Sequence, residues 1–162
     1  MTDITVRQAT PDDAATILQF ITELAIFEKA EHEVLTSIDL IQQTLFSSDA
    51  KAHALICEKA GQPIGFAVYF YNYSTWLGKY GLYLEDLYVT PAARRSGAGK
   101  IIFKALAKIA AANNCGRFEW SVLDWNEPAI KFYQALGAQE KTEWLGYRLT
   151  EAQLQALAVA AD

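Results

Sequence analysis

The sequence predicts a single α/β domain over residues 1–162, with helices on both faces of a mixed β-sheet. Three observations lead to this prediction. Segments of strand character alternate with segments of helical periodicity, and two strands follow one another early in the chain. Hydrophobic residues make up 52% of the chain and charged residues 20%, which is typical of a packed globular core. No repeat or linker divides the chain.

The N-terminal half predicts four strands and two helices. Ile4 and Val6 alternate with polar residues as a short strand. Thr10 and Pro11 provide an N-cap and a first-turn proline for a helix that keeps its apolar spacing to Ala25. A shorter helix opens at residues 36–39 and runs through Leu45. The expected strands are 52–58, 64–73 and 80–89, and a turn at 59–63 joins the first two.

The C-terminal half predicts three helices separated by strands. The first helix follows residues 94–100 and stops at residues 113–116, and the second spans residues 126–136 and is closed by Gly137. A strand is expected over 118–123, and two short strands between Gln139 and Leu149. Thr150 and Gln153 have capping-box spacing, which predicts a last helix.

Composition and charge narrow the possible partners. A net charge of −5 disfavours nucleic acid, which is bound through basic patches, and is compatible with a cationic substrate. No apolar run approaches the roughly 20 residues of a membrane span, and no export signal is visible, so we expect a cytoplasmic protein without a membrane partner. Cys57 and Cys115 lack CxxC or metal-type spacing, and we expect no metal site.

The segment from Arg94 to Lys100 has the pattern Arg-x-x-Gly-x-Gly at the start of a helix. Glycines there allow close approach of a ligand, and the first helical amides have no partner within the helix, so the turn can bind an anion. The alternative is a strand-to-helix turn without a ligand. A P-loop is excluded because Ile101 follows Lys100, and the GxGxxG fingerprint lacks its third glycine at Ile102.

A second motif follows, in which Asn126 starts a helix that carries Tyr133. Together the two motifs resemble the GNAT acetyltransferase superfamily. Further matches at residues 23–28, 73–76, 83–89 and 122–126 resemble its spermidine/spermine N-acetyltransferase family, closest to the thialysine (diamine) branch. The resemblance runs from Val6 to about Tyr147. Leu145 replaces the acidic residue that precedes the late Gly-Trp pair of the polyamine enzymes, which argues against spermine as the preferred substrate.

The resemblance implies a GNAT fold, with a mostly antiparallel sheet and a splayed central strand pair. It also implies a homodimer with acetyl-CoA as co-substrate, which transfers acetyl to a primary amine of a small cationic substrate of thialysine, diamine or polyamine type, by direct attack in a ternary complex. The implied cofactor-binding residues are Leu87, Tyr88, Val89, Arg94, Arg95, Ser96, Gly97, Ala98, Gly99, Lys100, Asn126, Pro128, Ala129 and Tyr133.

Direct attack requires a proton acceptor for the amine and a proton donor for the leaving thiolate. Glu85 is the first candidate acceptor and Asp86 the second; both can serve only if the strand bulges, because consecutive strand residues face opposite ways. The alternative is a solvent-facing acidic pair. Tyr133 is the general acid implied by the resemblance, and otherwise a core tyrosine. No nucleophilic triad is present, which disfavours a covalent acetyl-enzyme.

Acidic and aromatic groups are expected around the amine, because they suit a cation. The candidate substrate-binding residues are Phe27, Glu28, Trp76, Glu85, Glu119, Trp120, Ser121 and Asp124. For Glu28 a solvated helix face is the alternative. Other readings are a GNAT enzyme acting on a protein N-terminus, an amino acid or an antibiotic, a non-catalytic acyl-CoA-binding module, and a structural protein.

Overall fold

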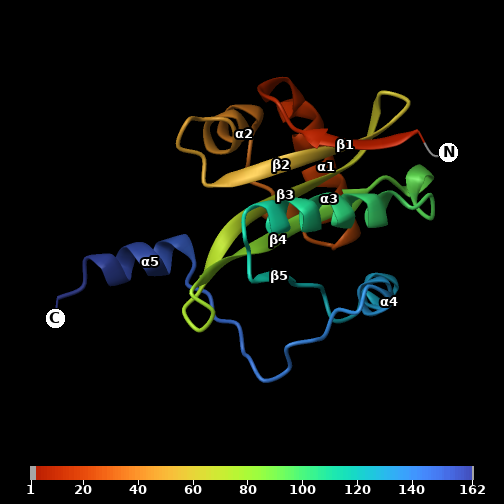
Figure 1. Cartoon of the computed structure of the whole chain (residues 1–162). Helices are drawn as coiled ribbons and strands as arrows, with labels where there is room; N and C mark the ends of the chain where they lie inside the picture. Colours follow the sequence, from red (N-terminus) through yellow and green to blue (C-terminus); the bar gives the residue numbers. More distant parts are fainter. Residues whose placement is uncertain (1–2, 162) are drawn as a thin grey trace. The chain divides into compact units, whose positions relative to one another are not determined.

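The computed structural model describes residues 3–161, in two compact units that divide after Ser121. The first unit contains the whole sheet and most of the helical core (Figure 1). The second begins at Val122 and contains two short helices. Each unit is described by itself below.

The first unit is built on a five-stranded sheet in the order β1-β2-β3-β4-β5. The first four strands are antiparallel neighbours, and β5 runs parallel to β4, which confirms the predicted mixed sheet. The strands are β1 (Ile4–Gln8), β2 (Ala52–Lys59), β3 (Gln62–Ser74), β4 (Lys79–Val89) and β5 (Arg117–Trp120). The last strand is therefore shorter than the predicted 118–123, because its pairing with β4 ends at Trp120.

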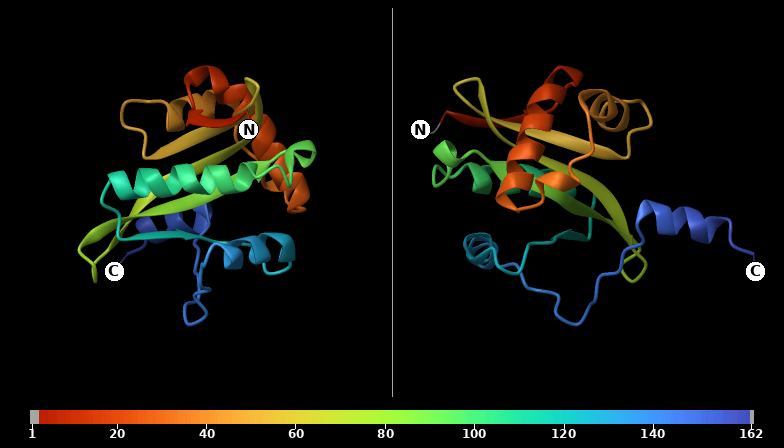
Figure 2. Two further views of the ribbon diagram at one scale, coloured as in Figure 1. Left: turned by 45° about the vertical axis from the view of Figure 1, so that its right-hand side comes forward. Right: turned by 180° about the vertical axis from the view of Figure 1, so that it is seen from behind.

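Helices lie on both faces of this sheet, as predicted (Figure 2). The helices of this unit are α1 (Ala14–Phe27), α2 (Ile38–Leu45) and α3 (Ala98–Ala112), with single 3-10 turns at Pro11–Asp13, Glu31–Glu33 and Pro91–Ala93. The predicted caps explain where two of them begin. Thr10 donates its amide to Asp13 Oδ2 at 2.7 Å, and the Ser37 hydroxyl accepts the Leu40 amide at 3.2 Å.

Each face of the sheet has its own packed layer. On one face, Ile17 and Phe20 of α1 pack with Phe66 of β3 and Tyr88 of β4. On the other, α3 contacts β1, β3, β4 and β5 and buries Ile102 and Leu106 completely. The β2–β3 connection is a two-residue turn in which Ala60 and Gly61 both have positive φ, as a tight hairpin requires.

The second unit confirms two predicted helices and corrects one prediction. The helices are α4 (Glu127–Ala135) and α5 (Glu151–Ala158), and α5 begins with the predicted capping box of Thr150 and Gln153. Residues 139–149 contain no strand, so the prediction of two short strands there was wrong. Apolar alternation alone does not make a strand without a partner, and an isolated hairpin is only marginally stable. Among residues 3–161, no helix has the length and apolarity that crossing a bilayer requires.

Candidate active site

Strand β4 contains a bulge at the acidic pair. Asp86 lies opposite Val68 of β3, whereas the next residue of β3, Tyr69, lies opposite Leu84. Glu85 is therefore the extra residue of β4, without a partner across the ladder. The sequence required such a bulge if Glu85 and Asp86 were both to serve one site, and the register confirms it. Asp86 shares the face of Val68, which packs against the α1 and α2 core.

Beyond the bulge, β4 separates from β5. The parallel pairing covers only Gly81–Leu84 and Arg117–Trp120, and a hydrogen bond of 2.9 Å between the hydroxyls of Tyr83 and Ser121 follows at its end. Residues 85–89 of β4 have no register partner in β5. This is the splayed strand pair that the family resemblance implied.

The main chain of the separated segment has a defined orientation. The Thr90 amide donates to the Ile64 carbonyl of β3 at 2.9 Å, so the main-chain groups of Thr90 face β3. Because successive residues direct these groups to opposite sides, those of Leu87 and Val89 face away from β3, toward the open edge. The carbonyl of Val89 accepts a hydrogen bond from Arg94 Nε at 3.3 Å.

The turn between β4 and α3 exposes main-chain amides. Arg95 has φ of 64° and Gly97, the N-cap of α3, has φ of 89°. The Ser96 hydroxyl donates to the Ala93 carbonyl at 2.6 Å and stabilises the turn from within. A Cβ on Gly97 would meet nothing within 4 Å, so the left-handed backbone, not crowding, requires glycine there.

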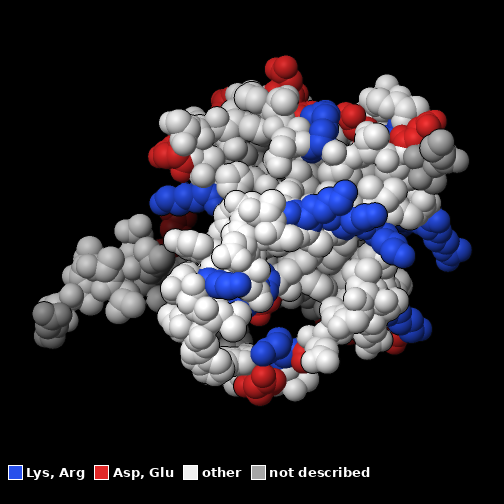
Figure 3. Space-filling model, viewed as in Figure 1, with Lys and Arg blue, Asp and Glu red and all other residues white. Residues whose placement is uncertain are grey.

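This geometry fits a diphosphate. The amides of Ala98, Gly99 and Lys100 have no partner within the helix, and the positive end of its dipole points the same way. Figure 3 shows basic side chains gathered over α3, whose exposed lysines are Lys100, Lys104 and Lys108. A diphosphate bound at this turn would meet main-chain amides without partners in the helix and nearby lysine side chains.

Asp86, beside the bulge, lies close enough to the carboxyl groups of Glu85 and Glu28 for their charges to act on it. Burial raises the pKa of Asp86 to about 6, and the nearby charges of Glu85 and Glu28 add to the rise. Burial also raises the pKa of Glu28, which caps the C-terminal end of α1. Glu85 is exposed. Glu28 is thus partly buried and not on a fully solvated face of the helix. It approaches Glu85 and Asp86 from the end of α1.

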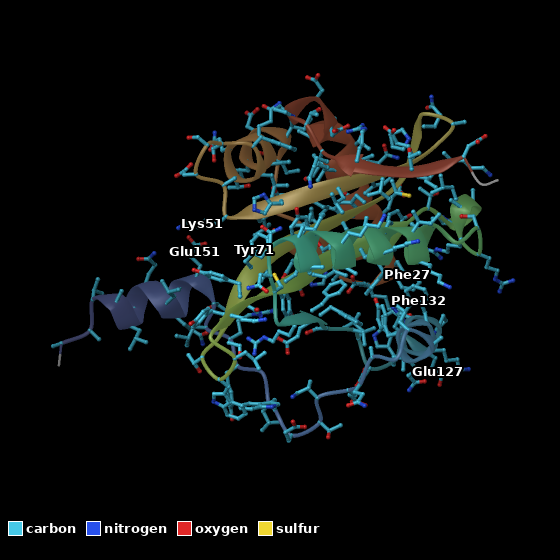
Figure 4. The ribbon with its side chains drawn as sticks, viewed as in Figure 1. Phe27, Lys51, Tyr71, Glu127, Phe132 and Glu151 are labelled. Atoms are coloured by element: carbon cyan, nitrogen blue, oxygen red, sulfur yellow. The ribbon has the colours of Figure 1, made fainter. Side chains whose placement is uncertain are left out.

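Phe27 is the last residue of α1 and directly precedes Glu28 in the chain (Figure 4). The Arg94 guanidinium carbon lies 5.2 Å from the centre of the Phe27 ring. This contact links the end of α1 to the turn before α3.

Other predicted substrate residues lie elsewhere in the first unit. The Trp120 ring packs 5.0 Å from Phe103 of α3, on the face opposite Asp86, and Glu119 forms an ion pair of 2.8 Å with Arg117 Nε. Trp76 lies in the turn between β3 and β4 and is 88% exposed. At about 3.3 Å per residue, the seven steps along β4 from Lys79 to Asp86 alone separate that turn from the acidic cluster by roughly 20 Å.

The remaining predicted residues belong to the second unit. The Asn126 side chain accepts the Ala129 amide at 3.4 Å and caps α4, which also contains Pro128 in its first turn. Tyr133 lies in the same helix, with its ring 5.6 Å from that of Phe132. Asp124 precedes α4 and is exposed. The structure therefore confirms that Asn126 begins a helix and that Tyr133 lies in it.

Sequence reasoning missed Glu23. Its Oε2 accepts a hydrogen bond from the Tyr88 hydroxyl at 2.6 Å, and its Oε1 accepts one from Gln19 at 2.8 Å. The sequence signal that could have found Glu23 is helical spacing, because Glu23 lies four residues before Phe27 and therefore on the same side of α1.

Comparison with known proteins agrees with this geometry. The acetyltransferase (GNAT) family model matches residues 18–138. Thialysine N-epsilon-acetyltransferase of Mus musculus is 36% identical, with 98% of this chain and 99% of the relative aligned, and the enzyme of that name from Caenorhabditis elegans is 33% identical with the same shares. An L-ornithine N5-acetyltransferase of Arabidopsis thaliana is 32% identical over 94% of this chain and 86% of its own.

Solved structures show the same fold. An integron cassette protein from the mobile metagenome of V. cholerae has a TM-score of 0.82 at 25% identity, covering 99% of this chain and all of its own. A metagenomic aminoglycoside acetyltransferase has a TM-score of 0.76 at 15% identity, covering 91% and 97%.

The fold, the bulged strand and the open amide turn thus define a GNAT-type acyltransferase domain. The chain belongs to the acetyltransferase (GNAT) family and is an acetyl-CoA-dependent N-acetyltransferase.

Proposed function

We propose that the protein acetylates a side-chain or terminal primary amine of a small cationic substrate, of the thialysine, diamine or polyamine type. The observation that carries this proposal is the half-buried carboxyl of Asp86, which lies with Glu28 and Glu85 beside the open edge of β4. Three carboxyl groups attract a cation, and one of them has a pKa suited to accepting its proton.

The chemistry of the amine sets the first requirement. An alkylammonium has a pKa of roughly 10.4, and only the neutral amine attacks a thioester. With a pKa of about 6, Asp86 is mostly ionised at neutral pH and still a stronger base than an ordinary aspartate. We therefore assign proton acceptance to Asp86 and keep Glu85, the exposed residue of the bulge, as the group that passes the proton to solvent.

The second requirement is a site for acetyl-CoA, which supplies the acetyl group as a thioester. The main-chain groups of Leu87 and the amide of Val89 would pair with the pantetheine arm as a neighbouring strand does, with Tyr88 between them, while the Val89 carbonyl accepts the hydrogen bond from Arg94. The Leu87 amide would donate to the thioester carbonyl oxygen. Amides of residues 95–100 would bind the diphosphate, with Arg94 beside it.

The α4 helix completes the proposal. Asn126, Pro128 and Ala129 would contact the cofactor at the start of that helix, and Tyr133 would protonate the leaving thiolate. A phenol with a pKa of about 10 can transfer a proton to a thiolate with a pKa of about 8.5 over a short distance. Asp124 would contribute a further acidic group for the substrate.

The relatives support the substrate class. Their printed names give thialysine and L-ornithine, two amino acids that carry a primary amine at the end of a short chain. Phe27 and Glu28 would bind the body of such a substrate, with the reacting amine at Asp86. We further propose a cytoplasmic homodimer, on the strength of the family resemblance.

The test is release of coenzyme A thiol from acetyl-CoA against a panel of amines. The panel contains thialysine, ornithine, lysine, putrescine, spermidine, an aminoglycoside and a peptide N-terminus. We expect turnover with the first members and little with the last two. Tyr133→Phe and Asp86→Asn should lower kcat by about 10²-fold or more while calorimetry still detects acetyl-CoA binding.

Two results would overturn parts of this proposal. Preference for the peptide or the aminoglycoside would replace the substrate class, and binding of acetyl-CoA without turnover of any amine would make the protein a binding module. Unchanged rates in both variants would remove the assigned proton-transfer roles.

A further inference from the structure

The Tyr88 hydroxyl lies on the face of β4 that carries Asp86. Tyr88 follows Asp86 by two residues, after the bulge, so the two side chains share a face. The ring is 5% exposed and packs 5.7 Å from that of Phe20. Its hydroxyl donates to Glu23 Oε2 at 2.6 Å, which joins β4 directly to α1.

Spacing makes this bond a neighbour of the acidic cluster. Glu23 and Glu28 are separated by about 7.5 Å along the helix, at roughly 1.5 Å per residue. Tyr88 and Asp86 are separated by about 6.6 Å along the strand, at roughly 3.3 Å per residue. Two interactions therefore act between α1 and β4, the Tyr88–Glu23 hydrogen bond and the charge interaction of Glu28 with Asp86.

One of these interactions is repulsive and the other is attractive. Glu28 and Asp86 are both acidic, and the charge of Glu28 disfavours ionisation of Asp86, so the ionised pair tends to part. The Tyr88–Glu23 bond is attractive and charge-assisted, because the tyrosine and Gln19 both lower the pKa of Glu23 and keep it ionised. Ionised Glu23 in turn contributes, with burial, to raising the pKa of Tyr88 to about 12, so the hydroxyl keeps its proton.

We propose that Tyr88 is a positioning residue, whose hydroxyl bond to Glu23 holds the end of α1 against β4 and so keeps Phe27 and Glu28 beside Asp86. This inference rests on the proposed function, in which those residues bind the amine. Its role is distinct from the proposed cofactor contact at residue 88, which concerns the main chain.

The test is Tyr88→Phe, which retains the ring that packs on Phe20. We expect KM for the amine to rise on the order of tenfold, as for loss of one charge-assisted hydrogen bond, with a smaller effect on kcat at high pH. The pKa of Asp86, followed by NMR of its carboxyl carbon, should fall by roughly half a pH unit as Glu28 moves away. The charged groups facing the two side chains are Glu28 and Glu85 at Asp86, and Glu23 and Arg94 at Tyr88.

Matched variants separate positioning from general stability. Tyr69→Phe removes another buried tyrosine hydroxyl, on the opposite face of the sheet, and should leave both readouts unchanged. Glu23→Ala should reproduce Tyr88→Phe, and Glu23→Gln, which still offers an amide oxygen, should restore part of the effect. The Glu23 variants also carry the test if Tyr88→Phe does not fold.

The outcomes distinguish this proposal from the proposed function. A wild-type protein that acetylates no amine contradicts the proposed function, whereas the NMR titration still reports on the link between α1 and β4. An unchanged pKa of Asp86 and an unchanged KM in both Tyr88→Phe and Glu23→Ala would overturn the positioning role.

Discussion

The carboxyl of Glu28, at the end of α1, lies close enough to Asp86 in β4 for its charge to raise the pKa of Asp86. The two residues are far apart in sequence, and the packing of Phe20 against Tyr88 brings their elements together. Burial is the larger cause of the rise, and Glu85 is the other charged neighbour. This arrangement sets the pH range in which the site can accept a proton.

We expect kcat/KM for the amine to fall on the acidic side with an apparent pKa near 6, the value to which Asp86 is raised. Protonated Asp86 can neither accept a proton nor attract a cation. Glu28→Gln should move this limb to lower pH, since a negative neighbour is removed. A pH–rate profile with a limb near pH 4 in the wild type would contradict the assignment.

Asp86→Asn should lower activity and raise stability at neutral and higher pH. The pKa of an ordinary aspartate is below that of folded Asp86, so the folded state favours the protonated form, and stability is lost as pH rises from about 4 through 6. At pH 8 the variant should be more stable by about 3 kcal/mol, because no charge is desolvated. Urea unfolding measures this, with the exposed Glu85→Gln as control. A gain that persists unchanged at pH 4 would contradict the explanation.

Gly97→Ala should weaken acetyl-CoA binding on the order of tenfold, because alanine resists the left-handed backbone that directs the turn amides. Gly61→Ala is the matched control. Gly61 also has positive φ and open space around its Cβ position, but it lies in the β2–β3 turn. Both should lose about 1 kcal/mol of stability, and only Gly97→Ala should raise the Kd measured by calorimetry. Equal affinities would argue against a diphosphate site at this turn.

Gly65→Ala should destabilise the first unit by about 2 kcal/mol, because a Cβ there overlaps the main-chain carbonyl of Tyr88 in the neighbouring strand. β3 and β4 would have to separate next to the open edge. Gly146→Ala, where a Cβ meets nothing within 4 Å, is the control. Thermal unfolding measures the difference, and equal melting temperatures would show that the strands adjust at no cost.

Local patterns predicted most of the elements and the position of the site. The caps at Thr10, Ser37 and Asn126 depend on neighbours within a few residues, so sequence spacing alone predicts them. A bulge was the condition under which Glu85 and Asp86 could both serve one site, and the register shows one at Glu85.

Other features depend on contacts between distant segments. Which acid of the pair is desolvated follows from the packing of β4 against α1, so the sequence favoured Glu85 whereas the structure favours Asp86. The partner of Tyr88 lies 65 residues away. Within residues 145–149, the apolar Leu145, Tyr147 and Leu149 alternate without a paired strand, and no local pattern reports the absence of a partner.

The turn before α3 presents main chain rather than side chains to its surroundings, and this makes it unusually tolerant of sequence change. The exposed side chain of Lys100 can be exchanged without altering the amide at that position, whereas the left-handed backbone of Gly97, with φ of 89°, and to a lesser degree that of Arg95, with φ of 64°, restricts the residue. Random mutagenesis of residues 95–100 followed by selection for acetyl transfer should therefore enrich many side chains at residue 100, small residues at the buried residue 98 and glycine alone at residue 97.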